Sequence, residues 1–478
     1  TDDGRIQGTR DGGATWNDLT PNVPGLPEHT YVTRIVASNE GAGTVYAAFD
    51  GHRNDDFAPY VYVSGNHGES WRRITNGLPE SSVNALAQHP RNPDLLFVGN
   101  EVGVWFSIDG GQRWASLGTN LPTTPVDDIE IHPRENDLVL GTHGRGAWIM
   151  SDIAPLEGLS PRVLAADAHL FPVRRATAYN SYDPQGWTPG VWAAENPPQG
   201  ALIRYYLGRD LEARQEAVTD GENGSGDNGG GQQAGGGRSQ QAHATVTIVD
   251  SEGETVRELE GPGEAGIQEV VWDLRHEPPY EPERGQGGGF FGAPRGPKVL
   301  PGTYTVRLAA AGQTMETPVE IRLDPRVEIS QGDLMARQEA MMDAYRLAEP
   351  EYRAGRALDR LTEQLEEVAA LLEEQESPPE ALTATVDSLE ARVAALDDEL
   401  DRVGIGFASF AIEGSHTRPT DDQLWQIDRA WEEVPGIVER VNALVTEEMP
   451  ALYDRLDQEG IRPDPGEAIA VPSRGGGG

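Results

Sequence analysis

The sequence predicts a multidomain, mainly β chain: a partial β-propeller, then a β-sandwich, then an α-helical bundle or hairpin. Three observations predict this class. A turn motif repeats among strand-like segments before residue 120, short alternating strands without repetition follow, and apolar residues recur three and four apart after residue 330. The 478 residues are too many for one hydrophobic core, so several domains are expected.

The repeated motif occurs at Thr9–Trp16 (TRDGGATW), Ser64–Trp71 (SGNHGESW) and Ser107–Trp114 (SIDGGQRW). Each copy has a hydroxyl residue, Asp or Asn two positions later, Gly two after that, and Trp three beyond the Gly. The short polar side chain accepts backbone N–H groups of its own turn, Gly adopts a positive φ, and Trp anchors the next strand. Because the middle copy has Asn where the others have Asp, we assign a structural role to these positions, namely Asp11, Trp16, Asn66, Trp71, Asp109 and Trp114.

The strands around the motif predict blades of a propeller over residues 1–152. Alternating segments predict four strands in each of two blades, at about 31–74 and 83–118, and a last repeat from Val126 that has no motif after it. At the front, Thr1 to Arg5 are expected to form the loop ahead of a third strand. Two strands would then be missing, and an upstream segment or a second chain would have to complete the ring.

The rest of the chain predicts two further domains. We expect a linker at 153–178, a β-sandwich at 179–326 with exposed Gly-rich loops at 220–241 and 285–296, helices at 327–460 and a flexible tail at 461–478. Phe290 to Gly292 in the second loop are a candidate aromatic contact. Ser330 is expected to cap the first helix, Ser377 and Pro378 to open the second, and Thr420 to cap a third that is interrupted at Pro435.

Charge and composition exclude several classes of function. Acidic residues outnumber basic ones 78 to 38, for a net charge of -40, and such a surface repels the phosphates of nucleic acids. No apolar run reaches the roughly 20 residues that span a bilayer. There is no cysteine, and Lys298 is the only lysine. An acidic, lysine-poor surface fits a saline habitat, although the base composition of the genome would also produce it.

Three features together resemble a bacterial family of exported proteins: the motif copies, DGHRNDDFAPYVYVS at Asp50 to Ser64, and GTHGRGAWI at Gly141 to Ile149. This is the BNR-repeat (Asp-box) "glycosyl hydrolase"-like or sortilin-like β-propeller family. The resemblance implies an extracytoplasmic bacterial protein whose propeller precedes an Ig-like sandwich and C-terminal helices. Since the Asp-box serves folding in glycosidases too, the family label is weak evidence for chemistry.

The candidate ligand-binding face lies opposite the boxes. In a blade the loops between the second and third strands, the B–C loops, lie on the face away from the boxes. Polar residues converge there from four repeats and could bind a glycan, an acidic ligand or a Ca²⁺ ion; otherwise no cofactor is expected. The candidates are Asp2, Asp3, Arg5, Asp50, His52, Arg53, Asp55, Asp56, Asn100, Glu101, Thr142, His143 and Arg145.

Three hypotheses of function remain open. The first is an extracytoplasmic binding or assembly protein that recognises a protein or a polysaccharide through this face. The second is a glycoside hydrolase, sialidase- or xyloglucanase-like, with catalytic residues partly upstream; it needs two carboxylates at a defined separation. The third is a structural subunit of a cell-surface assembly. In addition, the charged loop residues could simply pair with one another and hold adjacent blades in register.

Overall fold

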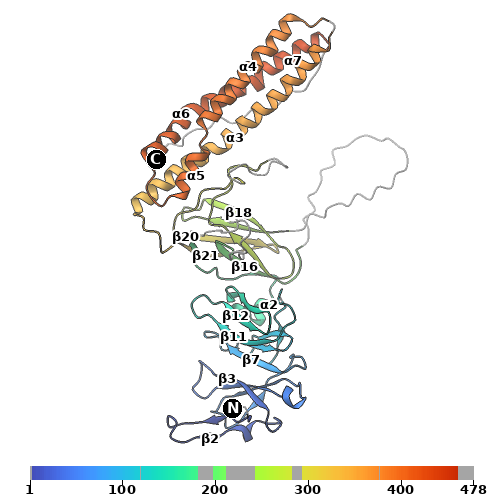
Figure 1. The fold of residues 1–478 in the computed structure, drawn as a ribbon, viewed down its shortest axis with the longest axis vertical. Coiled ribbons are helices and arrows are strands. Elements are labelled where there is room, and N and C mark those ends of the chain that lie inside the picture. The colour runs from blue at the N-terminus through green and yellow to red at the C-terminus, as the bar shows by residue number, and fades with distance from the viewer. Residues whose placement is uncertain are drawn as a thin grey trace, which may run out of the picture.

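The computed structural model describes residues 3–118, 120–180, 198–211, 243–282, 293–375 and 377–460. The molecule is elongated, with small β-sheets at the N-terminal end, larger sheets in the middle and long helices at the other end (Figure 1). The predicted order of a mainly β N-terminal part and a helical C-terminal region is confirmed. In the described part of the chain, no helix is long and apolar enough to cross a membrane.

The N-terminal part consists of four small antiparallel sheets in sequence order. Two of them have four strands, each strand pairing with the next along the chain, as in propeller blades. The strands are β1 (Gln7–Gly8) and β2 (Asn17–Asp18); β3 (Tyr31–Ala37), β4 (Val45–Asp50), β5 (Tyr60–Ser64) and β6 (Arg72–Arg73); β7 (Val83–Gln88), β8 (Leu96–Asn100), β9 (Gly103–Ser107) and β10 (Ala115–Ser116); and β11 (Val126–Ile131), β12 (Leu138–Thr142) and β13 (Gly146–Met150). Two short 3-10 turns, Thr20–Asn22 and His52–Asn54, lie in the loops.

All three Asp-boxes contain the same hydrogen-bond network. The hydroxyl oxygen of each box accepts the backbone N–H of the box glycine at 2.9 Å, and the hydroxyl donates to the Asp or Asn oxygen at 2.8–2.9 Å. That oxygen also accepts the N–H four residues on, at 2.8–3.0 Å. Asn66 thus accepts the same two groups as the aspartates, which is the geometry of a turn and not of a reacting group.

Each blade packs an apolar side chain onto the box of the next blade. A Cβ atom on Gly68 would lie 2.7 Å from Cδ1 of Leu19, and one on Gly111 would lie 2.6 Å from Cδ1 of Ile74. Only glycine leaves room for this contact, and both glycines have a positive φ. The box tryptophans Trp71 and Trp114 are 7% and 6% exposed within the same interfaces.

Trp16 differs from the other two box tryptophans. It is 59% exposed, and a Cβ on its box glycine, Gly13, would come within 4 Å of Trp16 alone. No preceding blade among the described residues covers this box. The ring of Trp16 beside the β1–β2 sheet is therefore exposed, whereas the corresponding rings of the next two boxes are buried.

The middle region contains two sheets with one shared core. One sheet has the order β14-β16-β19 and buries the large side chains of Tyr205 and Trp272; the other has the order β15-β21-β20-β17-β18. The segment 153–178, which we expected to be a linker, contributes β14 and β15. The elements are α1 (Ala154–Gly158), α2 (Pro161–Leu164), β14 (Ala168–Leu170), β15 (Ala176–Ala178), β16 (Ala201–Leu207), β17 (Ala244–Val249), β18 (Thr255–Gly261), β19 (Gly266–Trp272), β20 (Gly302–Ala310) and β21 (Gln313–Leu323).

The low-complexity segments lie mostly outside the described residues. This holds for 220–241, for 285–292 with the candidate contact Phe290 to Gly292, and for the tail 461–478. Residues 293–296 are described and differ from the expected exposed loop at their end, since Gly296 is buried. A Cβ there would lie 2.3 Å from the carbonyl oxygens of His276 and Glu277, so the chain packs directly against the backbone of the sandwich.

The C-terminal region is a bundle of helices around one apolar core. Its helices are α3 (Gln331–Glu373), α4 (Glu380–Val403), α5 (Gly406–Gly414), α6 (Asp421–Ala443) and α7 (Met449–Gln458), with a π-helical segment (Leu444–Glu448) between the last two. Ser330 accepts the N–H of Asp333 at 3.1 Å, and Thr420 forms a capping box with Gln423. The short helix α5 was not predicted.

The interruption that we predicted at Pro435 is absent. Helix α6 continues through this residue, and the irregularity instead lies at the π-helical segment that begins at Leu444. Val434, Ile437 and Val438 on either side of Pro435 are buried in the bundle. Their packing outweighs the lost backbone hydrogen bond, because tertiary contacts stabilise helices more than intrinsic propensity does.

Candidate functional site

The first strand of each complete or nearly complete blade contains a β-bulge at the same position. The register shifts between Val32 and Arg34 in β3, between Val83 and Ala85 in β7, and between Val126 and Asp128 in β11. The extra residues are Thr33, Asn84 and Asp127. A bulge leaves its extra residue out of the ladder and redirects the side chain, and bulges are frequent beside binding sites.

The bulges lie at the end of the blades where the B–C loops are. Tyr31 pairs with Asp50, Val83 with Asn100 and Val126 with Thr142, and each second partner is the last residue before a B–C loop. The first strands of successive blades also contact one another, β3 with β7 and β7 with β11. The bulge residues therefore form a row beside the candidate face.

A connected polar cluster occupies this row between the last two blades. The side-chain amide of Asn84 donates to Glu101 at 2.9 Å and lies 3.5 Å from Oδ1 of Asp127. The other oxygen of Asp127 lies 3.3 Å from Nδ1 of His143. The side chains of Asp127 and His143 are 50% and 80% exposed. We call Asn84, Glu101, Asp127 and His143 the mouth cluster; it presents imidazole, amide and carboxylate groups to solvent.

Two members of the mouth cluster, Glu101 and His143, are sequence-predicted candidates, whereas Asn84 and Asp127 were missed. A signal for them exists in the sequence. Each bulge residue is polar and directly follows a valine, as in VTRIVA, VNALAQ and VDDIEI. A serine or threonine lies three positions before each bulge residue. Period-two alternation hides this signal, because a bulge changes the register by one residue.

Asp50, Asn100 and Thr142 occupy equivalent strand ends and hold the B–C loops. Asp50 accepts the N–H of His52 at 2.9 Å and contacts its Nδ1, and Asn100 accepts the N–H of Val102 at 3.0 Å. Thr142 donates to the carbonyl oxygen of Gly146 at 2.6 Å. Asp50 and Asn100 are 5% and 1% exposed, so both lie beneath the face and shape it without reaching a ligand.

The long B–C loop at residues 51–59 is held by its own polar residues. Asp56 accepts the N–H of Ala58 at 3.0 Å and the hydroxyl of Tyr60 at 2.7 Å. Burial and this hydrogen bond raise the pKa of Tyr60 to about 12. Asp55 adopts a left-handed backbone conformation, and the guanidinium of Arg53 lies 4.6 Å from the ring centre of Tyr31.

The remaining candidates lie apart from the mouth cluster. Arg5 lies 3.6 Å from Asp3 and 4.0 Å from Asp18, which forms a separate charged group at the first sheet. The carbonyl oxygen of Arg145 accepts the indole N–H of Trp148 at 3.2 Å. Asp2 lies outside the described residues.

Ion pairs between blades also contribute to this side of the propeller. Arg34 in β3 pairs with Asp128 in β11, across the intervening blade. Within the ranges that the structure describes, no group of three or more His, Asp or Glu side chains could hold a metal ion.

Comparison with known proteins supports the propeller. Residues 59–152 match the sequence model of the family Sortilin-Vps10, described as "Sortilin, neurotensin receptor 3". This match begins just before β5 and runs through β13, and it supports a sortilin-like propeller in this chain. A search of curated proteins finds no relative at a significant level.

Solved structures with similarity include three GH74 proteins. They are a xyloglucanase from Xanthomonas campestris (13% identity, TM-score 0.25), an enzyme from Niastella koreensis (13%, 0.22) and an ancestral GH74 enzyme (14%, 0.21). The alignments cover 64%, 61% and 68% of this chain. They span 57%, 39% and 56% of the respective neighbours.

Proposed function

We propose that this chain is an extracytoplasmic binding protein that recognises a polysaccharide through the B–C loop face of its propeller. The mouth cluster carries the proposal. Its amide, imidazole and two carboxylates lie on two adjacent blades and are joined by hydrogen bonds, so they form a prepositioned set of donors and acceptors. Sugar hydroxyl groups both donate and accept, and they match such a set.

Apolar side chains at the loop tips support a ligand of this kind. Phe57 in one B–C loop is 52% exposed and Val102 in the next is 43% exposed. An exposed aromatic ring offers a flat apolar surface, which complements the C–H face of a sugar ring. The net charge of -40 disfavours polyanionic glycans and nucleic acids, so we expect a neutral or amino-substituted polysaccharide.

The pairing of the carboxylates disfavours the hydrolase alternative. A glycosidase needs one carboxyl as an acid and a second as a nucleophile or base, facing each other across the substrate. Here Asp50 pairs with His52, Asp56 with Tyr60, and Asp127 with His143. Each carboxylate already has a local partner, which suits a binding face better than an acid–base pair.

We further propose that another blade-like segment, upstream in the same protein or in a second chain, covers the β1–β2 sheet. The uncovered box at Gly13 and the exposed Trp16 support this, since the corresponding groups of the next two boxes are buried under a neighbouring blade. The middle sheets are proposed to form an Ig-like domain, and export from a bacterial cytoplasm follows from the family resemblance. Cell fractionation with an antibody against the chain tests the export.

A glycan-array screen tests the binding function. We expect the chain to retain a defined set of neutral polysaccharides, and Asn84→Ala and Asp127→Ala to weaken binding roughly ten-fold or more, because each removes several hydrogen bonds. Glu69→Ala is the matched control: it removes the exposed pair with Arg10 on the box side. Equal affinity of all three variants would overturn the proposal. If the chain binds a protein partner saturably and binds no glycan, the ligand is a protein and the polysaccharide proposal is wrong.

A further inference from the structure

A cavity of about 930 Å³ lies between the sandwich and the helical bundle. One wall comes from the sandwich segments around Arg275–Tyr280 and Ala293–Lys298, and the other from helices α3, α4 and α5. This volume falls in the range of about 300–1,000 Å³ that small-molecule sites have. Nothing in the propeller face depends on it, so the inference below is independent of the proposed polysaccharide site.

One end of the cavity has an excess of positive charge. The charges of Arg275, Arg337 and Glu413 act on the ammonium group of Lys298. Glu413 is already engaged, since it pairs with Arg275. Arg337 donates to the carbonyl oxygens of Ile412 and Glu413 at 3.1 and 2.8 Å. Among these described groups three cations stand against one carboxylate, in a chain whose net charge is -40.

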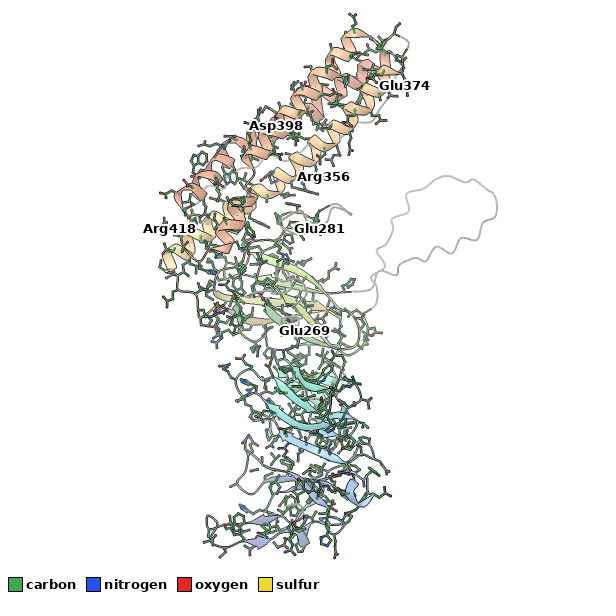
Figure 2. The ribbon with its side chains drawn as sticks, viewed as in Figure 1. Glu269, Glu281, Arg356, Glu374, Asp398 and Arg418 are labelled. Carbon is green, nitrogen blue, oxygen red and sulfur yellow. The ribbon has the colours of Figure 1, made fainter. Side chains whose placement is uncertain are left out.

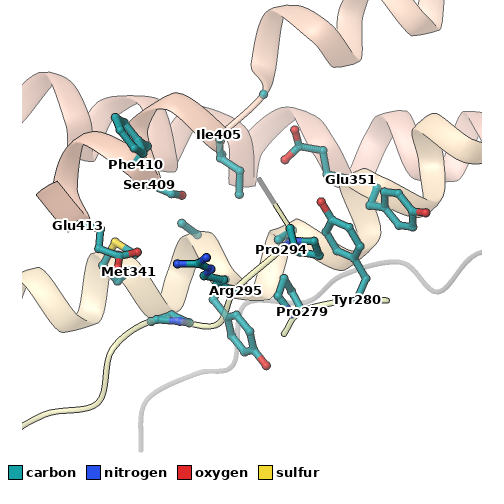
Figure 3. Close-up of a pocket in the computed structure, with 18 of the residues that line it drawn as sticks. Pro279, Tyr280, Pro294, Arg295, Met341, Glu351, Ile405, Ser409, Phe410 and Glu413 are labelled. Atoms are coloured by element: carbon teal, nitrogen blue, oxygen red, sulfur yellow. The ribbon is translucent and has the colours of Figure 1, made fainter. Parts of the chain in front are cut away.

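Lys298 is the only lysine of the protein. Among the described residues, no hydrogen bond or ion pair engages its ammonium group. Burial lowers the pKa of Lys298, and the neighbouring arginines lower it further. A half-buried cation with no carboxylate of its own is costly unless an anion neutralises it. Arg295 also lines the cavity, on the side where Figure 3 shows Glu413, and adds a further cation there.

Apolar side chains line the cavity beside the basic end, and acidic side chains line its other side. Met341, Ala344 and Phe410 line it beside the basic end, on α3 and α5. Figure 3 shows Arg295, Met341 and Glu413 on one side of the cavity, and Glu351 with Tyr280 on the other. Asp397 and Asp401 also line the cavity, and the charge of Asp401 helps burial to raise the pKa of Glu351. The carboxylates of Asp397 and Asp401 would repel a second anionic group on a ligand.

We propose that the cavity binds a small organic monoanion, with its carboxylate against Lys298 and Arg295 and its apolar body along α3 and α5. The basic end supplies the charge that the anion neutralises, and the apolar lining buries the body. The acidic side selects against ligands with a second negative group. A dicarboxylate of the same length therefore binds more weakly than the monocarboxylate.

The single lysine makes a direct test possible in the full chain. Reductive methylation with isotope-labelled formaldehyde labels the amines of Lys298 and of the N-terminus for NMR. The methyl signal that is missing in Lys298→Gln belongs to Lys298. Phenylbutyrate is the probe. Phenylbutanol has the same apolar group without the charge, and acetate has the charge without the apolar group. We expect phenylbutyrate to shift the Lys298 signal saturably, and both controls to bind roughly ten-fold more weakly or worse.

Calorimetry on unlabelled variants completes the test. Lys298→Gln is expected to weaken phenylbutyrate binding roughly ten-fold, whereas Lys298→Arg, which keeps the charge, retains most of it. If acetate binds as tightly as phenylbutyrate, the site holds an adventitious ion only and the proposal is wrong. Equal binding of phenylbutanol, or an unchanged Lys298 signal, also overturns it. If Lys298→Gln does not fold, the labelled wild-type titration decides alone.

Discussion

Arg204 of β16 pairs with Asp152, two residues beyond the last strand of the propeller, with 3.2 Å between Nη1 and Oδ2. The same guanidinium donates to the backbone carbonyl oxygens of Ser151 and Asp152 at 3.0 and 2.8 Å, and to Glu269 at 2.7 Å. Glu269 lies on the sandwich near its propeller end (Figure 2). One arginine thus joins the last blade to the sandwich through main-chain and carboxylate acceptors together.

Replacing Arg204 is expected to weaken this junction strongly. The side chains of Arg204 and Asp152 are 12% and 5% exposed, so Arg204→Ala leaves a buried carboxylate without its partner. Losing one partner of a buried pair costs about 3–5 kcal/mol. Urea unfolding followed by tryptophan fluorescence measures the loss. Arg307→Ala, which removes an exposed pair with Glu316, is the control and is expected to cost less than about 1 kcal/mol; similar losses in both variants would contradict the assignment.

The Asp-box at Asn66 gives a test of structural against catalytic roles. Asn66→Ala removes an acceptor for the N–H of Ser70 and for the hydroxyl of Ser64, and it is expected to lower the free energy of unfolding by about 1–2 kcal/mol. Asn66→Asp keeps both acceptor functions and is expected to stay within about 0.5 kcal/mol of the wild type.

Thermal unfolding and glycan binding, measured on the same preparations, separate the two roles. Both Asn66 variants are expected to keep full binding at the B–C loop face, since the box lies at the other end of the blade. A large loss of stability in Asn66→Asp would show that the amide N–H, which donates to Ser70 at 3.0 Å, is the essential group.

Much of this fold could be read from the sequence because its signals are local. The box specifies a turn whose hydrogen bonds lie within seven residues, as at Ser64 and Ser70, and helix caps such as Thr420 are equally local. Strands β14 and β15 were missed because three residues are too few to show alternation. They are strands only through partners far along the chain, β16 and β21.

The candidate site could be predicted only in part. Glu101 and His143 were found from their place in the loops, and Asp50 and Asn100 were found for the same reason although they are buried. Asn84 and Asp127 were missed, because a bulge is defined by its pairing with the neighbouring strand. The sequence shows which residues precede a loop, but the exposure and the register depend on long-range contacts.

Two glycines offer a matched test of how the blades pack. Gly111→Ala places a Cβ 2.6 Å from Ile74 of the preceding blade, in addition to the penalty of a positive φ. Gly13→Ala carries the same kind of φ penalty, but its Cβ meets only the ring of Trp16, at 3.8 Å. We expect a loss of about 1 kcal/mol for Gly13→Ala and a further 1–3 kcal/mol or so for Gly111→Ala.

Differential scanning calorimetry of the two glycine variants measures this difference. Equal losses would contradict the proposed packing of each blade on the next box. The same pair also reports on the proposed covering segment: when a longer chain or a partner covers the β1–β2 sheet, the loss for Gly13→Ala is expected to rise toward that for Gly111→Ala.

Glu351 in the cavity predicts how stability depends on pH. Burial raises the pKa of its carboxyl; the N–H of Ile405 acts in the opposite direction, Asp401 adds to the rise, and the result is about 7 against an ordinary 4.5. Between pH 4.5 and about 7 the folded chain therefore holds a proton that the unfolded chain has lost. Stability from this group is complete below pH 4.5 and falls as the pH rises toward 7.

Glu351→Gln is expected to remove this dependence, because a neutral amide occupies the same space and does not titrate. Urea midpoints of the helical bundle at pH 5 and pH 8, followed by circular dichroism, compare the variant with the wild type. The variant is expected to match the wild type at pH 5 and to be the more stable of the two at pH 8. Glu433→Gln is the control: the pair with Arg429 lowers the pKa of this exposed carboxyl, so it titrates below pH 5 and leaves the difference between the two midpoints unchanged. An equal difference in wild type and Glu351→Gln would mean that the carboxyl of Glu351 is ionised throughout, and that the acidic side of the cavity is open to water.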